Sequence, residues 1–308
     1  MNLARVRASG DRVLGGYVED EQFFALLPAD GHTGHEALVD IAMGHRRGDR
    51  LKAAGPMPLD EVRVLPPVPF PPAVRDFYAF EQHVKTARES RGMEMDPDWY
   101  ELPVFYFTNP ATIIGHDDDV RPPTESRMLD YELEVAAVVG RDLSDATPSQ
   151  AADAIAGYTI FDDFSARDVQ MREMAQMLGP AKGKDFANAF GPFLVTADEL
   201  PGGTEGRPTG AMVARVNGTE YSRGELGDCH WSFAEMIAYA SRDSRVRRGD
   251  LIGSGTVGTG CILELQLVHG ADSYPWLRAG DVVELEVEGI GVLRNRIGEP
   301  GGRPNLPS

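Results

Sequence analysis

The segment that most constrains the fold is Leu129-Asp130-Tyr131-Glu132-Leu133-Glu134-Val135-Ala136-Ala137-Val138-Val139-Gly140. The run Val135–Val139 is apolar at every position, which predicts a strand that is buried on both faces. Glu132 and Glu134 stand two residues apart, so both carboxylates project from one face of that strand. Like charges repel and are costly to bury without partners, and a hard divalent cation prefers carboxylate oxygens. We therefore predict a metal site here; the alternative is that one face of the strand is solvated.

Composition and charge limit the class of protein. The 308 residues suffice for one large domain, or for a large and a small one. A net charge of −18 argues against nucleic acid or an anionic membrane as the partner. Two cysteines, Cys229 and Cys261, are too few for a disulfide framework. We see no apolar signal segment and no run of about 18 apolar residues that would span a membrane, so we expect a cytoplasmic protein.

A proline-rich stretch divides the chain. Residues 1–65 hold short apolar runs between Gly and Asp turns, which predict strands near Arg12–Val18 and Phe23–Leu27 and a helix near His35–Met43. The stretch Leu65–Pro72 cannot be a helix or a central strand, because it contains too many prolines. We interpret it as an extended linker. The predicted domains are therefore a small β-rich unit over 1–65 and a catalytic domain over 66–308.

The rest of the chain mixes two periodicities. Helical spacing appears at Ser149–Ala156, Ala166–Gln176 and Phe233–Ser241, and Ser232 is a candidate cap for the last of these. The strand-like runs are Val104–Phe107, Leu133–Val139, Tyr158–Phe161, Phe193–Val195, Met212–Val216, Ile262–Val268 and Val282–Val287. Strands outnumber helices and do not alternate strictly with them. The pattern favours a β-rich α+β fold over a doubly wound sheet.

Besides the glutamate pair, three segments place acids, a histidine or lysines beside turns, where catalytic groups are common: Asp76–His83, Gly157–Asp168 and Gly179–Phe186. Each also has a structural interpretation. Asp163 could be the N-cap of a helix that starts at Ser165, His83 could be a structural histidine, and Lys184 could lie on the surface.

Taken together, these segments resemble the fumarylacetoacetate hydrolase family, in its fumarylacetoacetase-like branch, over about residues 66 to 298. Gly157–Asp168 resembles the most specific signature of that family, Gly-Tyr-Thr-x-x-x-Asp-x-Ser-Ala-Arg-Asp. The strand Glu-x-Glu and the order of the motifs also fit. The remaining matches are Asp76–His83, the lysine loop Gly183–Phe186, and Ser254–Leu265, which resembles a Gly-Thr turn followed by a strand glutamate.

The resemblance implies a mixed β-sheet roll as the catalytic domain, a homodimer, and one divalent ion. The ion would be Mg²⁺, with Ca²⁺ or Mn²⁺ as alternatives, because oxygen ligands disfavour zinc. Its ligands would be Asp76, Glu132, Glu134 and Asp163. His83 would act as the general base on a water molecule, with its ring oriented by Glu264. Lys184 and Gln170 would stabilise negative charge that develops on the substrate.

The same resemblance implies the substrate contacts Tyr78, Arg91, Met174, Gly255 and Thr256. Gly255 and Thr256 would line the pocket opposite the metal, and Arg88 is the alternative to Arg91. Two positions depart from fumarylacetoacetase. Met174 stands where that enzyme has a tyrosine, and Asp185 follows the lysine where serine is common. These departures affect the identity of the substrate more than the class of reaction.

The implied activity is metal-dependent hydrolysis of a carbon–carbon bond in an acylpyruvate or a similar 1,3-diketo acid, by water that the His83–Glu264 pair activates. The same family also contains decarboxylases, isomerases and sugar-acid dehydratases, which act on 2-oxo acids. A non-catalytic metal-binding protein is a further alternative. A cupin-type oxygenase would need clustered histidine ligands, and the seven histidines here are scattered.

Overall fold

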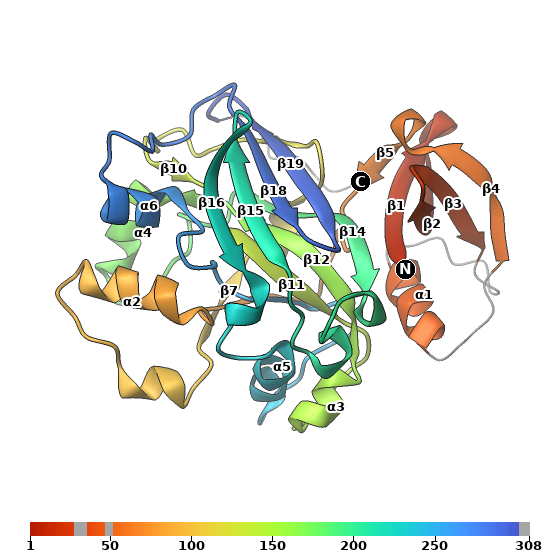
Figure 1. The fold of residues 1–308 in the computed structure, drawn as a ribbon, viewed down its shortest axis with the longest axis horizontal. Coiled ribbons are helices and arrows are strands. Elements are labelled where there is room, and N and C mark those ends of the chain that lie inside the picture. Colours follow the sequence, from red (N-terminus) through yellow and green to blue (C-terminus); the bar gives the residue numbers. More distant parts are fainter. Residues whose placement is uncertain (28–35, 47–51, 302–308) are drawn as a thin grey trace.

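The computed structural model describes residues 1–27, 36–46 and 52–301, and it is built from two β-sheets with short helices around them (Figure 1). The larger sheet has 12 strands, and its main order is β4-β3-β2-β1-β14-β12-β11-β17-β6-β7. A second sheet of five strands, in the order β16-β15-β18-β19-β9, packs against it, and β10 pairs with β13 in a separate ribbon. This arrangement is the β-rich α+β fold that the sequence predicts.

The strands of the large sheet are β1 (Asn2–Ala8), β2 (Arg12–Glu19), β3 (Gln22–Leu27), β4 (Lys52–Pro58), β5 (Arg63–Leu65), β6 (Val74–Phe77), β7 (Phe105–Thr108), β8 (Ile113–Ile114), β11 (Leu133–Val139), β12 (Ile155–Asp163), β14 (Asn188–Thr196) and β17 (Leu251–Gly253). The others are β9 (Asp119–Val120), β10 (Leu129–Asp130), β13 (Ser165–Ala166), β15 (Ala211–Val216), β16 (Thr219–Glu225), β18 (Val282–Val287) and β19 (Gly291–Ile297). The α-helices are α1 (Glu36–Arg46), α2 (Glu81–Glu89), α3 (Pro148–Ala152), α4 (Arg167–Met174), α5 (Phe233–Ser241) and α6 (Ile262–His269).

Strand β11 is buried on both faces, as its sequence predicts. Val135 and its alternate neighbours pack into the core between the two sheets. Ala136 and Val138 point the other way, into a second core that residues of α1 cover. The central strand is therefore covered on one side by a sheet and on the other by a helix.

Several predicted elements are confirmed with small changes of their ends. The helix over Phe233–Ser241 is present, and Ser232 caps it through a reciprocal contact with Glu235. The helix near His35–Met43 is α1, although His35 lies outside the described residues. The helix predicted over Ser149–Ala156 is shorter, because its last two residues already belong to β12.

One predicted strand is wrong. The run Ile262–Val268 forms helix α6, so Glu264 is a helical residue and not a strand residue. Its apolar side chains do not alternate between two buried faces, since Leu267 and Val268 are both about half exposed. The Asp130 carboxylate, distant in sequence, accepts the first backbone N–H groups of this helix. Such a partner cannot be recognised in a local window.

The N-terminal strands continue the large sheet. Strand β1 pairs antiparallel with β14, through Asn2 with Val195 and Leu3 with Leu194. In Figure 1, β1 to β5 and α1 form the side of the molecule opposite α2, α4 and α6. The proline-rich stretch after Leu65 has no regular secondary structure before β6 begins at Val74. That residues 1–65 form a unit of their own stays a prediction.

Candidate active site

Four acids gather on one face of the large sheet. Val74, Ala136 and Phe161 belong to the core on the α1 side of the sheet. Because side chains two residues apart in a strand share a face, the acids project from that same side. These acids are Asp76 on β6, Glu132 immediately before β11, Glu134 near the start of β11, and Asp163 at the end of β12. All four are buried, and each offers an oxygen within 4.8 Å of the others. The pair predicted on one strand face is therefore half of a cluster from three strands.

Two glycines make room for this cluster. Gly253 on β17 lies opposite Asp76, and a Cβ atom there would come within 2.4 Å of the Asp76 Oδ1 atom. Gly255 has a φ of +79°, and a Cβ atom there would lie 2.4 Å from the Phe77 carbonyl oxygen. The backbone N–H of Gly255 can therefore approach closely, and it donates to Asp76 at 3.2 Å and to Glu134 at 3.1 Å.

Two buried cations compensate part of the negative charge. The Lys184 ammonium lies 2.5 Å from both Glu132 Oε2 and Asp163 Oδ2. Arg167 donates through Nη2 to Glu132 Oε1 at 2.7 Å. The Tyr106 hydroxyl donates to Asp163. Glu132 thus has two cationic partners and Asp163 has one.

The acids without a cationic partner have raised pKa values. Burial, followed by the charge of Asp163, raises the pKa of Asp76 well above its usual range. Burial and the charge of Asp76 do the same for the pKa of Glu134. Burial would also raise the pKa of Glu132, but the charges of Lys184 and Arg167 outweigh it and lower that pKa. Burial raises the pKa of Asp163 to about 6, against the opposing effect of Lys184.

The chemistry of the cluster fits a divalent cation. When its carboxyl groups are ionised, the cluster holds an excess of negative charge, because Asp76 and Glu134 have no ion-pair partner among the described residues. They form a side-chain hydrogen bond with each other and accept from the neutral donors of Gly255 and Thr256. In addition, Asp163 Oδ1 is buried without a hydrogen-bond partner in the described part of the chain. Mg²⁺, Ca²⁺ and Mn²⁺ are the ions that an all-carboxylate set of oxygens favours.

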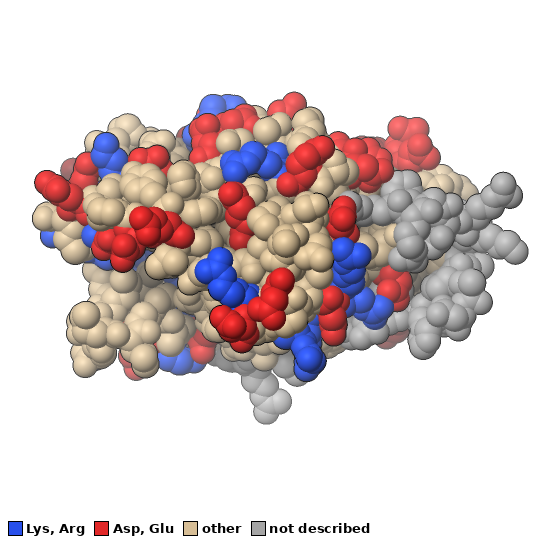
Figure 2. Space-filling view, turned by 90° about the horizontal axis from the view of Figure 1, so that it is seen from below, with Lys and Arg blue, Asp and Glu red and all other residues tan. Residues whose placement is uncertain are grey.

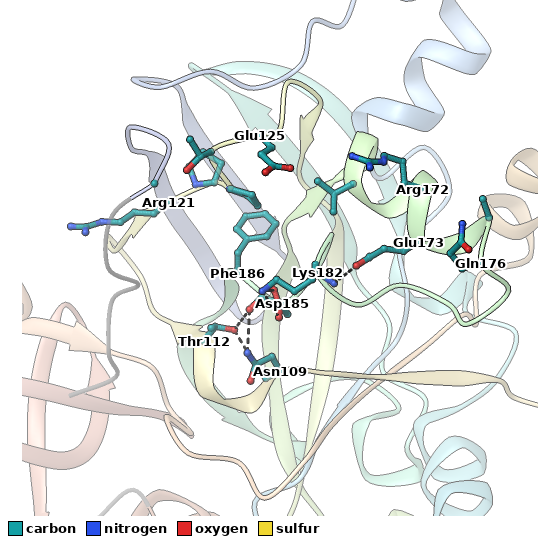
Figure 3. Close-up of a pocket in the computed structure, with 16 residues that line it drawn as sticks. Asn109, Thr112, Arg121, Glu125, Arg172, Glu173, Gln176, Lys182, Asp185 and Phe186 are labelled. Atoms are coloured by element: carbon teal, nitrogen blue, oxygen red, sulfur yellow. Dashed lines mark hydrogen bonds and ion pairs between the residues drawn. The ribbon is translucent and has the colours of Figure 1, made fainter.

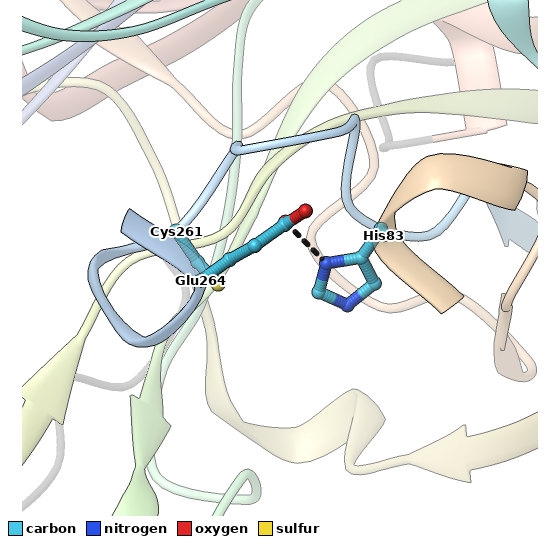
Figure 4. Close-up of side chains that lie close together, drawn as sticks. All are labelled: His83, Cys261 and Glu264. Carbon is cyan, nitrogen blue, oxygen red and sulfur yellow. Dashed lines mark hydrogen bonds and ion pairs between the residues drawn. The ribbon is translucent and has the colours of Figure 1, made fainter. Parts of the chain in front are cut away.

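The predicted histidine–glutamate pair is formed. His83 on α2 and Glu264 on α6 face each other, with His83 Nδ1 2.7 Å from Glu264 Oε2 (Figure 4). Glu264 is buried and His83 is 12% exposed in its side chain. Cys261 lies beside them, and burial raises its pKa well above the usual value, so its thiol is not a nucleophile at neutral pH.

One cavity of about 280 Å³ collects the predicted site residues. Of the thirteen, eleven line it: Asp76, Tyr78, His83, Arg91, Glu132, Glu134, Gln170, Met174, Lys184, Gly255 and Thr256. The other two, Asp163 and Glu264, contact lining residues from behind. Gly255 and Thr256 donate directly to cluster acids, so they lie beside the proposed metal position and not opposite it. Most of the remaining lining is apolar, including Phe105, Met171 and Leu263.

A larger cavity of about 990 Å³ lies on the other side of α4 and the lysine loop (Figure 3). Helix α4 turns Gln170 and Met174 to the acidic cavity, whereas it turns Arg172 and Glu173 to the larger one. In the segment that contains the lysine loop, Lys184 lines the acidic cavity, whereas Lys182, just before the loop, lines the larger one. The larger cavity contains none of the predicted site residues.

The structure decides several alternatives left by the sequence. Asp163 is not a helix N-cap, because Ala166 takes that position before α4. Arg91 lines the acidic cavity, whereas Arg88 donates to the Glu94 carbonyl. Asp185 pairs with Lys182 at 2.9 Å, so its charge is directed away from Lys184.

Three residues of the site, the buried Asp130 and Arg167 and the half-buried Tyr106, received no role from the sequence. Arg167 stands within the quoted signature, but a basic residue on a helix is usually solvated. Tyr106 lies in a predicted strand without a polar pattern. Asp130 precedes the glutamate pair and accepts hydrogen bonds from Arg167 and from α6. Asp130 and Arg167 differ from surface residues in their burial, at 0% and 4% exposure, which the sequence does not show.

The family model for the C-terminal part of fumarylacetoacetate (FAA) hydrolase matches residues 73–298, which include the whole acidic cluster and the histidine–glutamate pair. The chain belongs to the fumarylacetoacetate hydrolase family. It is therefore a member of a family of enzymes, and the resemblance of its motifs is confirmed.

Relatives within the fumarylacetoacetate hydrolase family carry different activities in their names. The chain is 31% identical over 243 residues to oxaloacetate tautomerase YisK of Bacillus subtilis, covering 78% of this chain and 74% of that protein. It is 30% identical to fumarylacetoacetase of Arabidopsis thaliana, over 62% of this chain and 57% of that one. Its fold matches fumarylacetoacetate hydrolase from Exiguobacterium antarcticum with a TM-score of 0.77 and 26% identity, over 97% of this chain and 99% of that chain.

The face of the molecule drawn in Figure 2 gives no further indication of the substrate. Figure 2 shows one face of the molecule, on which lysine and arginine side chains lie singly or in small groups among acidic ones. Among the described residues, none of the helices combines the length and the apolar character needed to cross a membrane.

Proposed function

We propose that this protein is a metal-dependent hydrolase that cleaves a carbon–carbon bond in an acylpyruvate or a related 1,3-diketo acid. The observation that carries the proposal is a preformed His83–Glu264 pair, 2.7 Å apart, whose histidine lines the same small cavity as a buried cluster of carboxylates. Water that attacks a metal-bound diketo acid must first be activated, and this requires a base close to the cation site.

The His83–Glu264 pair would supply the base. Because Glu264 accepts a hydrogen bond from Nδ1, the other ring nitrogen of His83 keeps its lone pair and can take a proton from water. The water oxygen then bonds to a substrate carbonyl carbon. When the carbon–carbon bond breaks, its electron pair leaves as an enolate, and His83 returns the proton to that carbon. The products are a carboxylic acid and a ketone, so atoms and charge balance.

Other residues of the chain would bind and orient the substrate. Asp76, Glu132, Glu134 and Asp163 would hold Mg²⁺, which would polarise neighbouring substrate oxygens when bound. Lys184 uses two of its three N–H donors on Glu132 and Asp163, which leaves one for a substrate oxygen. The apolar wall and Arg91 at the cavity suit an acid with one apolar end.

A second candidate is keto–enol tautomerisation of a 2-oxo acid, and the name of the YisK relative favours it. This reaction moves a proton between carbon and oxygen, so the same base suffices and no water is consumed. The two candidates therefore differ in the products and not in the residues they need.

The test is a substrate panel assayed with Mg²⁺ and after exhaustive treatment with EDTA. Cleavage of acylpyruvates and of fumarylacetoacetate-like diketo acids would be followed by loss of the enol absorbance, and that of acylpyruvates also by coupled detection of the released pyruvate. Oxaloacetate would be followed by the decay of its enol. We expect cleavage of at least one acylpyruvate, abolished by EDTA and restored by Mg²⁺. Tautomerisation without cleavage would favour the second candidate, and activity unaffected by metal removal would overturn the metal-dependent mechanism.

A further inference from the structure

Asp130 is a buried acid that connects the two halves of the candidate site. It lies on β10, immediately before the glutamate strand, and is 0% exposed. Its Oδ1 atom accepts the backbone N–H of Ile262 at 2.7 Å. Its Oδ2 atom accepts the backbone N–H of Leu263 at 3.0 Å and Nε of Arg167 at 2.8 Å. Three donors from two different elements thus converge on one carboxylate.

The first connection leads to the histidine–glutamate pair. Ile262 and Leu263 are the first two residues of α6, and Glu264 is the third. Cys261, at the N-cap, makes no side-chain hydrogen bond to the helix, so Asp130 supplies the acceptors that a capping residue normally provides. An acid at this end also interacts favourably with the helix dipole. Asp130 therefore determines where α6 starts and how Glu264 approaches His83.

The second connection leads to the acidic cluster. Arg167 spans from Asp130 to Glu132 Oε1, which its Nη2 atom reaches at 2.7 Å. Its third nitrogen, Nη1, donates to Gln170 Oε1 at 3.0 Å. Since a guanidinium is planar and rigid, holding Nε at Asp130 also determines the direction in which the other nitrogens point. Asp130 thereby orients a carboxylate of the cluster through an intermediate residue.

We propose that Asp130 is a positioning residue that holds the His83–Glu264 pair and the acidic cluster in a fixed relation to each other. That this fixed arrangement serves catalysis rests on the proposed function, whereas the contacts of Asp130 that produce the arrangement do not. A carboxylate is needed here, because both of its oxygens only accept hydrogen bonds. An asparagine would direct its NH₂ group at one or two of the three donors, depending on its orientation, and would lose the charge that pairs with Arg167.

The test is Asp130→Asn, compared with Asp250→Asn. Asp250 is a matched control, because it is also buried and also accepts from an arginine, Arg75, and from a backbone N–H, that of Arg247. It contacts neither α6 nor the acidic cluster in the described structure. Both variants lose a buried charged hydrogen bond, so a general loss of stability would affect both.

Two readouts need no substrate. The first is the downfield proton resonance of His83 Nδ1–H, assigned by its absence in His83→Ala. The second is Mn²⁺ affinity, measured by calorimetry on the full chain. In Asp130→Asn we expect the resonance to broaden or shift and Mn²⁺ affinity to fall about 10-fold, as for other residues that orient metal ligands. Asp250→Asn should leave both readouts as in the wild type.

If an acylpyruvate is turned over, a third readout follows. We expect Asp130→Asn to lower kcat about 100-fold with little change in KM, because displacement of a catalytic group by about 1 Å has an effect of this size. A chain without hydrolase activity would contradict the proposed function and leave the first two readouts intact. A folded Asp130→Asn protein with unchanged resonance and Mn²⁺ affinity would overturn the positioning role.

Two variants that keep Asp130 test each connection separately if Asp130→Asn does not fold. Ile262→Pro removes the first N–H of α6 and also shortens a buried apolar side chain, so Ile262→Val is measured beside it as the control for packing. Proline is tolerated at this position, and Cys261 already has the extended conformation that a residue before proline requires. Ile262→Pro should perturb the resonance and leave Mn²⁺ affinity within about twofold. Arg167→Met should lower Mn²⁺ affinity and leave the resonance in place. Absence of both effects would overturn the proposal.

Discussion

At the scale of single residues, the site is organised by unequal compensation of charge. Glu132 has two cationic partners, whereas Asp76 and Glu134 have no ion-pair partner among the described residues and form a side-chain hydrogen bond with each other. The histidine base belongs to none of these pairs, because it contacts Glu264 instead. Binding of a metal and activation of water should therefore depend on different residues.

This separation predicts the effect of His83→Ala. We expect kcat on the best acylpyruvate to fall about 10²- to 10⁴-fold, the range for loss of a general base, with Mn²⁺ affinity unchanged. Steady-state kinetics and calorimetry measure the two quantities. His116→Ala is the control, since His116 lies near Asp117 and Arg294 and outside the acidic cavity. Full activity of His83→Ala would exclude the histidine as the base.

At the scale of elements, helix α4 and the lysine loop act as one wall between the two cavities. Glu173 on α4 accepts the backbone N–H groups of Ala181, Lys182 and Gly183 at 3.0, 2.6 and 3.0 Å. Figure 3 shows the contact with Lys182. Gly183 packs so closely on α4 that a Cβ atom at this residue would lie 2.7 Å from the backbone nitrogen of Gln170. The loop that presents Lys184 is therefore attached to the helix that presents Gln170.

Glu173→Gln should loosen this attachment, because a neutral amide has one acceptor oxygen where the carboxylate has two. We expect the amides of residues 181–183 to exchange with deuterium about 10-fold faster, as local opening becomes easier. Peptide-resolved hydrogen exchange measures this directly. Glu125→Gln, in the same cavity, should leave exchange in the loop unchanged. Equal exchange in wild type and Glu173→Gln would show that the carboxylate does not hold the loop.

At the scale of the whole molecule, the acidic cluster joins strands that are distant in the sequence. Asp76, Glu134 and Asp163 come from β6, β11 and β12, and β17 separates the first two strands in the sheet. In the absence of a cation, burial and the neighbouring acids oppose ionisation of these groups and raise the pKa values of Asp76 and Glu134, so the ionised cluster is costly to bury. A bound ion should therefore stabilise the native fold as well as serve the reaction.

We expect Mg²⁺ or Mn²⁺ to raise the midpoint of thermal unfolding. An ion at about 100 times its Kd adds about 2.7 kcal/mol to the stability of the folded state, which amounts to several degrees for a chain of this size. Differential scanning calorimetry with and without EDTA measures the shift. In Glu134→Gln the shift should shrink, because one ligand charge is lost. No shift with Mg²⁺, Ca²⁺ or Mn²⁺ would argue against a metal site.

Much of the local structure could be predicted because its causes are local. An unbroken apolar run predicts a strand buried on both faces, and β11 is one. Ser232 before a helical pattern predicts a capped helix, and α5 is one. Glu264 was placed on a strand instead of a helix, because the acceptor that starts α6 is Asp130, more than a hundred residues away. Contacts of this kind leave no trace in a local window.

The sequence by itself determined the chemistry of this protein: a carboxylate pair on a buried strand, the ordered motifs of one enzyme family, and the types of residue that could bind a cation and activate water. Only the tertiary structure decided how these residues meet. The sheet order places Asp76 and Asp163 beside the pair, Gly253 leaves room between them, and Arg91 rather than Arg88 lines the cavity. The physical reason is that alternation along a strand is a local property, whereas the neighbours of a buried charge come from strands and helices that only folding brings together.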